Sequence, residues 1–305
     1  MESLAPLIAA SINAGTPLML AALGLLINEK SGVVNLGAEG MMLVAAVAGF
    51  AITVSSGSMT IGFIGGAAAG MLLAAFFALL TVWLGTNQYA TGLALSLFGA
   101  GASAYIGIGY VGISLTNAKF SIPFLENIPF LGTALFRQHP MVYLSLALCG
   151  AIIWFLYRTR AGLILRAVGE SPSSAHALGY NVRMIRFAAL LFGGACCGLA
   201  GAFLSVVYTP LWVEGMVAGR GWIALALTTF ATWRPARVMS GAYLFGGVTI
   251  LTFHIQALGV PIPSQLLSML PYVATIVVLV LISRNPDWIK LNMPASLGKN
   301  FHPHS

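Results

Sequence analysis

Charged residues are scarce in this chain. Asp, Glu, Lys and Arg together make up 7% of its 305 residues, whereas hydrophobic residues make up 59% and the mean hydropathy is +0.93. A water-soluble globule of this size needs more polar surface than these residues supply. The composition therefore excludes a soluble protein and predicts an integral membrane protein.

Cysteine is also scarce, and its placement argues against a disulfide-stapled protein. The three cysteines, Cys149, Cys196 and Cys197, lie in apolar stretches, where a thiol behaves as a small hydrophobe. Two of them are adjacent and cannot easily bridge each other. We therefore expect no disulfide.

Two functional signals are missing as well. Residues 1 to 5 contain no Lys or Arg, so the cationic region of a cleavable signal peptide is lacking and the first apolar stretch should remain as an anchor. The only Gly-Lys pair, Gly298-Lys299, is followed by Asn300 in a tail that we expect to be flexible. A phosphate-binding loop of the GxxxxGK[ST] type is therefore excluded, and we expect no nucleotide, cofactor or metal.

Long apolar runs fill the rest of the sequence. About 20 apolar residues are needed to cross a bilayer as a helix, because lipid offers the backbone no hydrogen-bond partners. The chain is predicted to be all-α, a polytopic membrane helix bundle in one domain over residues 1–305. The nine expected spans are 6–27, 33–55, 60–84, 88–112, 141–157, 187–208, 216–233, 238–258 and 266–283. Asn35 and Glu39 make the second span partly polar and Arg220 does so for the seventh, so either could be re-entrant or broken.

Positive residues predict the orientation, because cytoplasmic loops are enriched in Lys and Arg. The segments rich in these residues fall on one side of the nine-span arrangement: 158–186, 234–237 and 284–305. The opposite loops, 113–140, 209–215 and 259–265, hold only Lys119, Glu126, Arg137 and Glu214. We therefore predict an external amino terminus and a cytoplasmic carboxyl terminus. The net charge of +7 then follows from topology and does not indicate nucleic-acid binding.

Glycines recur at four-residue spacing in two spans. They are Gly62, Gly66 and Gly70 in the third span and Gly194 and Gly198 in the sixth. Such spacing makes flat faces where another helix can approach closely. Ordinary packing within the bundle is favoured over a special dimer face.

Two other classes of membrane protein, an intramembrane hydrolase and an ion-coupled transporter, have weaker support in the sequence. Ser103 and His254 are the best pair for an intramembrane serine hydrolase, but no orienting acid or oxyanion donor accompanies them. An ion-coupled secondary transporter usually buries several ionisable groups. Only Glu39 and Arg220 fall within the expected spans, and a structural salt link from Glu39 to Lys30 or to another helix is as good an interpretation as a substrate contact.

The polar stretch 166–186 has the signals of a short capped helix. Ser171 followed by Pro172 favours a helix start, and Gly179 favours a stop in the left-handed conformation. Two turns of helix are marginal in water, so this segment should pack against something. Ala175 and Leu178 are expected on one face, small enough to enter a cleft in a partner; a solvated connector is the alternative.

Four stretches resemble a known family. The coupling-loop residues that carry the resemblance are Gly169, Glu170, Ser171, Pro172, Ala175, Leu178, Gly179, Asn181, Val182 and Arg183. Their order resembles the cytoplasmic coupling loop of ABC importer permeases of the branched-chain amino acid, ribose and simple-sugar superfamily. "SGVVNLGAEGMM" (31–42), "NQYATGLALSL" (87–97) and "GRGWIALAL" (219–227) are similar to its nucleoside and simple-sugar branch.

The resemblance implies a non-catalytic permease subunit in a bacterial inner or plasma membrane. Its implied partners are a companion permease, identical or different, cytoplasmic ABC ATPase subunits that bind loop 158–186, and an external substrate-binding protein. The tail 284–305 would be cytoplasmic. The pathway for a small-molecule substrate is expected at the interface with the companion permease, and its candidate residues are Asn35, Glu39, Asn87, Gln88 and Ser96. Few charges in the spans favour a neutral, hydroxyl-rich substrate, and helix-to-helix hydrogen bonding remains an equal interpretation of each residue.

Overall fold

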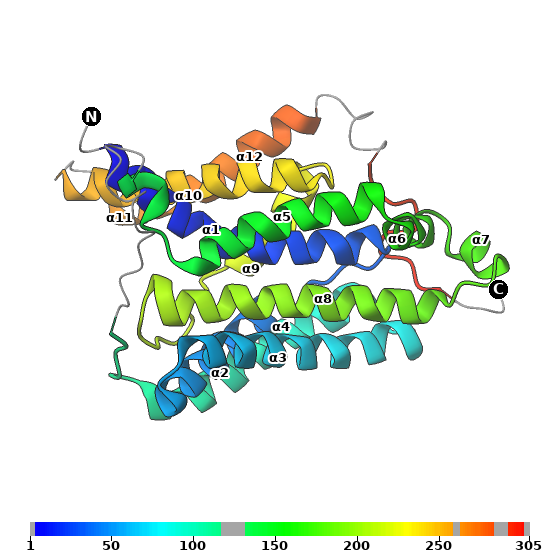
Figure 1. The fold of residues 1–305 in the computed structure, drawn as a ribbon, viewed down its shortest axis with the longest axis horizontal. Helices are drawn as coiled ribbons and strands as arrows, with labels where there is room; N and C mark the ends of the chain where they lie inside the picture. The colour runs from blue at the N-terminus through cyan, green and yellow to red at the C-terminus, as the bar shows by residue number, and fades with distance from the viewer. Residues whose placement is uncertain (1–3, 117–131, 259–262, 284–291, 302–305) are drawn as a thin grey trace.

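The computed structural model describes residues 4–116, 132–258, 263–283 and 292–301, and within these the chain is a bundle of helices (Figure 1). Seven helical segments are long and apolar enough to cross a membrane. At 1.5 Å per residue, their 19 to 27 residues reach about 28 to 40 Å, which suffices for a hydrocarbon core about 30 Å thick. The polytopic helical class is thus confirmed. The seven are α1 (Leu4–Lys30), α2 (Ala38–Ser56), α3 (Met59–Ala78) with η1 (Leu79–Trp83), α4 (Gln88–Gly107) with η2 (Ile108–Tyr110), α5 (Pro140–Arg158), α8 (Val182–Phe203) with η5 (Leu204–Tyr208) and α10 (Pro235–Ala257).

The other two expected spans contain shorter helices. In place of 216–233 lies α9 (Arg220–Phe230), whose 11 residues reach about 16 Å, half of a bilayer core. In place of 266–283 lie α11 (Ser264–Ser268) and the 14-residue α12 (Leu270–Ser283). A short segment, η4 (Gly132–Phe136), precedes α5. The estimate of nine full spans was therefore too high within the described residues.

Backbone conformation explains why α9 is short. Ala218 and Gly219 just before it have φ of 52° and 80°, and Thr232 and Trp233 just after it have φ of 48° and 52°. Residues with positive φ cannot continue a right-handed helix, and non-glycine residues adopt it rarely. Helix α9 is therefore stopped at both ends by left-handed turns.

The second expected span, 33–55, is a continuous helix from Ala38 onward and is neither re-entrant nor broken. Helix α2 begins only at Ala38, and residues 31–37 form an irregular connection after α1. Gly32 in this connection has φ of 91°. We call residues 31–37 the α1–α2 connection.

Helices α1, α2, α3 and α8 form the core, and glycines let them touch. A Cβ atom on Gly70 of α3 would overlap the carbonyl oxygen of Gly194 on α8, and one on Gly198 would overlap that of Gly66. These contacts confirm the expectation of ordinary packing within the bundle. In Figure 1, α2, α3 and α4 lie on one side of α8 while α1, α5, α10 and α12 lie on the other. The cysteines Cys149, Cys196 and Cys197 are buried and free.

Large apolar side chains cover the outer faces of α3 and α4. Leu72, Phe76, Leu97, Phe98 and Tyr105 are all more than half exposed. A soluble monomer rarely exposes a continuous apolar face of this kind. These faces are suited to lipid or to another apolar helix.

Two segments predicted to share one side lie at one end of the bundle. Figure 1 shows α6 (Arg160–Glu170), α7 (Pro172–Ala177) and the carboxyl-terminal tail together at one end, with the amino terminus at the other. The turn holding Trp233 reaches the same end, because that residue bonds Glu29 beside Lys30. We call this the cation-rich end. At the opposite end the predicted loops meet, since Leu115 N donates to Pro210 O. Of the charged residues used for the orientation, Lys119, Glu126, Arg284, Asp287 and Lys290 lie outside the described residues.

Candidate functional site

Glu39 binds the amino-terminal end of α9. Its Oε1 accepts from Gly219 N at 2.8 Å and its Oε2 from Gly221 N at 2.7 Å. The side chain is buried, with 9% of its surface exposed. A carboxylate is well placed here, because a helix amino terminus presents unpaired N–H groups and a partial positive charge. Glu39 is therefore linked to another helix, α9, by main-chain hydrogen bonds and not by the salt link that was expected.

Gly221 allows this close approach. A Cβ atom at that position would lie 2.6 Å from both Cα and N of Glu39. The first turns of α2 and α9 thus touch through main-chain atoms. The motifs 31–42 and 219–227 meet at this contact, in which Glu39 and Gly219 are 180 residues apart.

The contact between Glu39 and α9 lies inside the bundle. Along α4, Gln88 Oε1 accepts from Val34 N at 2.9 Å, and Ser96 Oγ donates to Leu36 O at 2.8 Å. Eight residues of helix separate these two side chains, a rise of about 12 Å. The α1–α2 connection therefore runs along α4 from the cation-rich end toward the middle of the bundle. Helix α2 thus begins inside the bundle and not at its end.

The remaining candidate pathway residues are occupied by local bonds. Asn35 is fully buried, and its Oδ1 accepts from Gly37 N at 3.0 Å. Exposed Asn87 caps α4 by accepting from Tyr89 N and Ala90 N. Asn35, Glu39, Gln88 and Ser96 therefore lie in or beside the α1–α2 connection. Exposed Asn87 lies next to Gln88, at the start of α4.

A second buried glutamate holds the other end of α9. Glu29, at the end of α1, accepts from Trp233 Nε1 and from Thr228 Oγ1, the latter at 3.0 Å. Only 3% of the Glu29 surface is exposed. Glu29 was not predicted as a buried charge, because it lies two positions beyond the first expected span. A charged pair, Glu29-Lys30, directly after an apolar run was the available signal.

The helix signals in the coupling loop are confirmed. Helix α7 starts at Pro172, with the Ser171 Oγ accepting from Ser174 N at 3.3 Å. Gly179 after it has φ of 89°. Asn181 Oδ1 then caps α8 by accepting from Met184 N at 3.1 Å. The stretch from α6 to α8 is therefore a folded projection with its own caps.

The orientation expected for Ala175 was wrong. Its surface is 2% exposed and packs with Val168 and Val182, covered by Phe301. Leu178, by contrast, is 77% exposed. The two do not share a face because α7 ends at Ala177, and Leu178 turns outward in the cap. Leu178 is the side chain of this pair that a partner can reach.

The described part of the tail packs against the bundle, contrary to the expectation of a flexible tail. Residues 292–301 run along the cation-rich end, and Ser296 N donates to Gly169 O at 3.0 Å. Lys30 Nζ donates to Asn292 O at 2.8 Å. No pattern in the sequence of this segment indicates these contacts.

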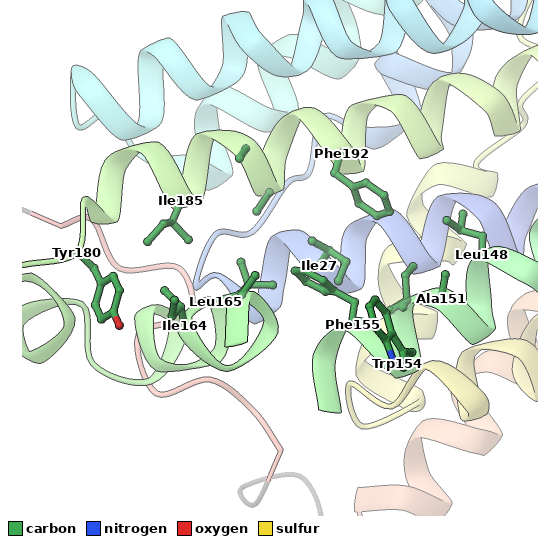
Figure 2. Close-up of a pocket in the computed structure, with 14 residues that line it drawn as sticks. Ile27, Leu148, Ala151, Trp154, Phe155, Ile164, Leu165, Tyr180, Ile185 and Phe192 are labelled. Carbon is green, nitrogen blue, oxygen red and sulfur yellow. The ribbon is translucent and has the colours of Figure 1, made fainter. Parts of the chain in front are cut away.

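An apolar cavity lies beside the coupling loop (Figure 2). Its volume is about 650 Å³, and Figure 2 shows side chains from α1, α5, α6 and α8 around it, among them Ile27, Phe155, Leu165 and Phe192. Tyr180 lies at one end. This lining has few hydrogen-bonding groups for a hydroxyl-rich substrate. The cavity is therefore not our candidate for the substrate pathway.

The candidate hydrolase pair is used otherwise. Ser103 is buried and its Oγ donates to Ala100 O at 3.0 Å within α4. His254 is exposed on α10. Among the described contacts, Ser103 is not hydrogen-bonded to a base that could activate it as a nucleophile.

A helical bundle with seven long apolar helices, a short helix α9 that meets the start of α2 inside it and a folded projection at its cation-rich end defines a polytopic membrane protein. The sequence profile of the family described as "Branched-chain amino acid transport system / permease component" matches residues 7–281. The chain belongs to this family. It is a non-catalytic permease subunit of an ABC importer, a class that associates with ATPase and substrate-binding protein partners.

Three relatives match most of their own length and of this chain. TsgC13 of Haloferax volcanii, provisionally named a glucose ABC transporter permease protein, is 39% identical over 99% of both chains. The nucleoside ABC transporter permease protein NupC of Lactococcus lactis is 33% identical over 87% of this chain and 88% of its own. The guanosine ABC transporter permease protein NupQ of Bacillus subtilis is 30% identical over 98% of this chain and 99% of its own. No solved structure matches the chain significantly.

Proposed function

We propose that this permease subunit carries nucleosides or simple sugars and that loop 158–186 is where its ATPase binds. The single observation that carries the second part is the capped projection at the cation-rich end, with Leu178 77% exposed at its tip. An exposed leucine on a rigid, capped turn is suited to a hydrophobic groove in a soluble partner. The proposed site comprises Glu170, Ser171, Pro172, Leu178, Gly179, Asn181 and Arg183, while buried Gly169 and Ala175 support it from beneath.

The substrate class is supported by the names of the relatives and by the polar groups inside the bundle. NupC and NupQ are named for nucleosides and guanosine, and TsgC13 for glucose. The α1–α2 connection offers amide, hydroxyl and main-chain groups, and the carboxylate of Glu39 is already occupied by α9. Neutral groups of this kind match a neutral, hydroxyl-rich solute better than an ion.

We place the pathway along the α1–α2 connection and the start of α9, with Asn35, Glu39, Asn87, Gln88 and Ser96 at its border. The single domain would pair with a companion permease through its exposed apolar faces. The cation-rich end, with loop 158–186 and tail 284–305, would face the cytoplasm of a bacterial cell and the amino terminus would lie outside.

Leu178→Asp tests the docking role of the loop. A charge at the tip should weaken association with the ATPase by about tenfold or more, because truncating or charging a central interface anchor costs about 2 kcal/mol or more. Co-purification of the ATPase with the permease and ATP-dependent uptake are the measurements. Leu84→Asp is the matched control, since Leu84 is 67% exposed outside the loop.

Normal ATPase association of Leu178→Asp would show that the loop is an ordinary connector. Uptake of labelled guanosine, uridine and glucose into vesicles holding the assembled transporter separates the substrate classes. Transport of none of them by the wild-type complex would remove the substrate proposal and leave the docking role untouched.

A further inference from the structure

The tail residues Asn292–Phe301, which we call the strap, join parts of the chain that are far apart in sequence. Ser296 binds the end of α6 twice, through N at 3.0 Å and Oγ at 2.6 Å from Gly169 O. Gly298 N donates to Gly32 O at 3.1 Å in the α1–α2 connection. The strap therefore bonds the coupling loop on one side and the proposed pathway on the other.

Asn300 extends the strap to the start of α4. Its Nδ2 donates to Gly85 O at 2.6 Å and Thr86 O at 3.1 Å, and its Oδ1 accepts from Gln88 Nε2 at 3.1 Å. Gln88 in turn accepts from Val34 N. One amide side chain is thus saturated by partners that belong to the α3–α4 turn and, through Gln88, to the α1–α2 connection.

Arg186 completes the junction from the coupling-loop side. It lies in the first turns of α8 with 2% of its surface exposed. Its guanidinium donates to Ser31 O at 3.1 Å, Lys299 O at 3.1 Å and Ser296 Oγ at 3.2 Å. A buried cation is costly unless its donors are satisfied, and two of these three acceptors come from the strap.

The underside of the projection is closed by the strap as well. Phe301 packs against the cluster of Val168, Ala175 and Val182, and its ring centroid lies 5.5 Å from that of His176. Gly169 leaves no room for a side chain, because a Cβ atom would overlap the carbonyl oxygen of Lys30. Helix α7 has only six residues and cannot act as a stiff lever alone. Held by the strap, it is fixed to the ends of α1 and α3.

We propose that the strap Asn292–Phe301 is a positioning element that transmits movement of the coupling loop to the α1–α2 connection and to the start of α4. This role rests on the proposed function, in which the loop binds the ATPase. The strap acts through Asn300, Ser296 and Arg186 and touches neither nucleotide nor substrate. Its loss should separate ATP hydrolysis from transport.

Asn300→Ala and Ser296→Ala in the complete transporter test this role. In proteoliposomes with ATPase and loaded binding protein, both variants should keep ATPase association and hydrolyse ATP within about twofold of wild type. Uptake per ATP should fall at least about fivefold, the lower end of typical coupling between sites. Met293→Ala is the matched control, because Met293 is 42% exposed in the same segment; it should leave uptake per ATP unchanged.

Three outcomes are distinguishable. Wild-type uptake per ATP in Asn300→Ala would overturn the proposal. Loss of ATPase association together with uptake, at normal abundance in the membrane, would also overturn it, because the strap would then only hold the loop in shape. A wild-type chain that associates with no ABC ATPase would instead refute the proposed function, and with it the strap's role.

Discussion

The two ends of α9 are each held by a buried glutamate, but the donors differ. At the amino-terminal end both oxygens of Glu39 accept from main-chain N–H groups of Gly219 and Gly221. At the carboxyl-terminal end Glu29 accepts from side chains, the indole of Trp233 and the hydroxyl of Thr228. A carboxylate is favoured by the partial positive charge at a helix start and disfavoured by the partial negative charge at its end.

The difference indicates what each glutamate contributes. Glu39 satisfies main-chain donors that have no helical partner, so its two charged oxygens are needed where they are. Glu29 accepts from side-chain donors at the carboxyl-terminal end of α9, where negative charge is unfavourable. An uncharged acceptor should therefore replace its carboxylate with little loss of stability. Three substitutions sharpen or break this comparison.

The largest effect is expected for Glu39→Ala. Two buried N–H groups lose their acceptor, and each costs about 1 to 3 kcal/mol. We expect a loss of about 3 kcal/mol or more in the free energy of unfolding, measured by thermal or chemical denaturation in detergent, and loss of uptake. The loss for Glu39→Gln should lie between that of Glu39→Ala and zero, because the amide oxygen can accept from one of the two N–H groups. Glu214→Gln is the control, an exposed acid before α9. Wild-type stability of Glu39→Ala would show that α9 does not depend on this anchor.

A smaller effect is expected for Gly221→Ala. The added methyl group would lie 2.6 Å from main-chain atoms of Glu39, so α2 and α9 must move apart. Overpacking of this kind costs about 1 to 3 kcal/mol, read from the same denaturation curves. Gly101→Ala in α4 is the matched control, since nothing lies within 4 Å of a Cβ atom there. Equal stability of the two alanine variants would contradict the close approach of α2 and α9.

The smallest effect is expected for Glu29→Gln. The amide oxygen can accept from Trp233 Nε1 as the carboxylate does, so stability should change by less than about 1 kcal/mol. Trp233→Phe should cost more, because it removes the donor and leaves a buried carboxylate with one partner fewer. If Glu29→Gln destabilised the bundle as much as Glu39→Ala, the proposed difference between the two ends of α9 would be wrong.

Features set by neighbouring residues were predictable from the sequence. The long apolar runs predicted nine spans, seven of which contain long apolar helices in the described residues. Ser171, Pro172 and Gly179 marked both ends of α7 correctly, because helix length and caps are local properties. The polar pair Asn35 and Glu39 lies where α2 begins, but α2 itself continues unbroken to Ser56. Arg220 correctly indicated an interrupted seventh span.

Features set by distant contacts were not predictable. The carboxylate of Glu39 could not be assigned to α9, because its partners lie 180 and 182 residues away. The burial of Ala175 depends on Phe301, and the order of the tail depends on Gly169 and Gly32. Nothing in the tail's own composition indicates these partners. A single sequence supplies no information on such pairs, and the outward face of the coupling loop was therefore misassigned.

The strap also fixes when the cytoplasmic face can mature during biosynthesis. Its residues leave the ribosome after all seven long helices have been made, while one of its partners, Gly32, is among the first to be synthesised. Arg186 must therefore wait for Ser296 and Lys299 before its guanidinium is fully bonded. The proposed docking surface for the ATPase is therefore completed only after the strap has been synthesised, so a permease chain that ends before the strap should lack a finished loop.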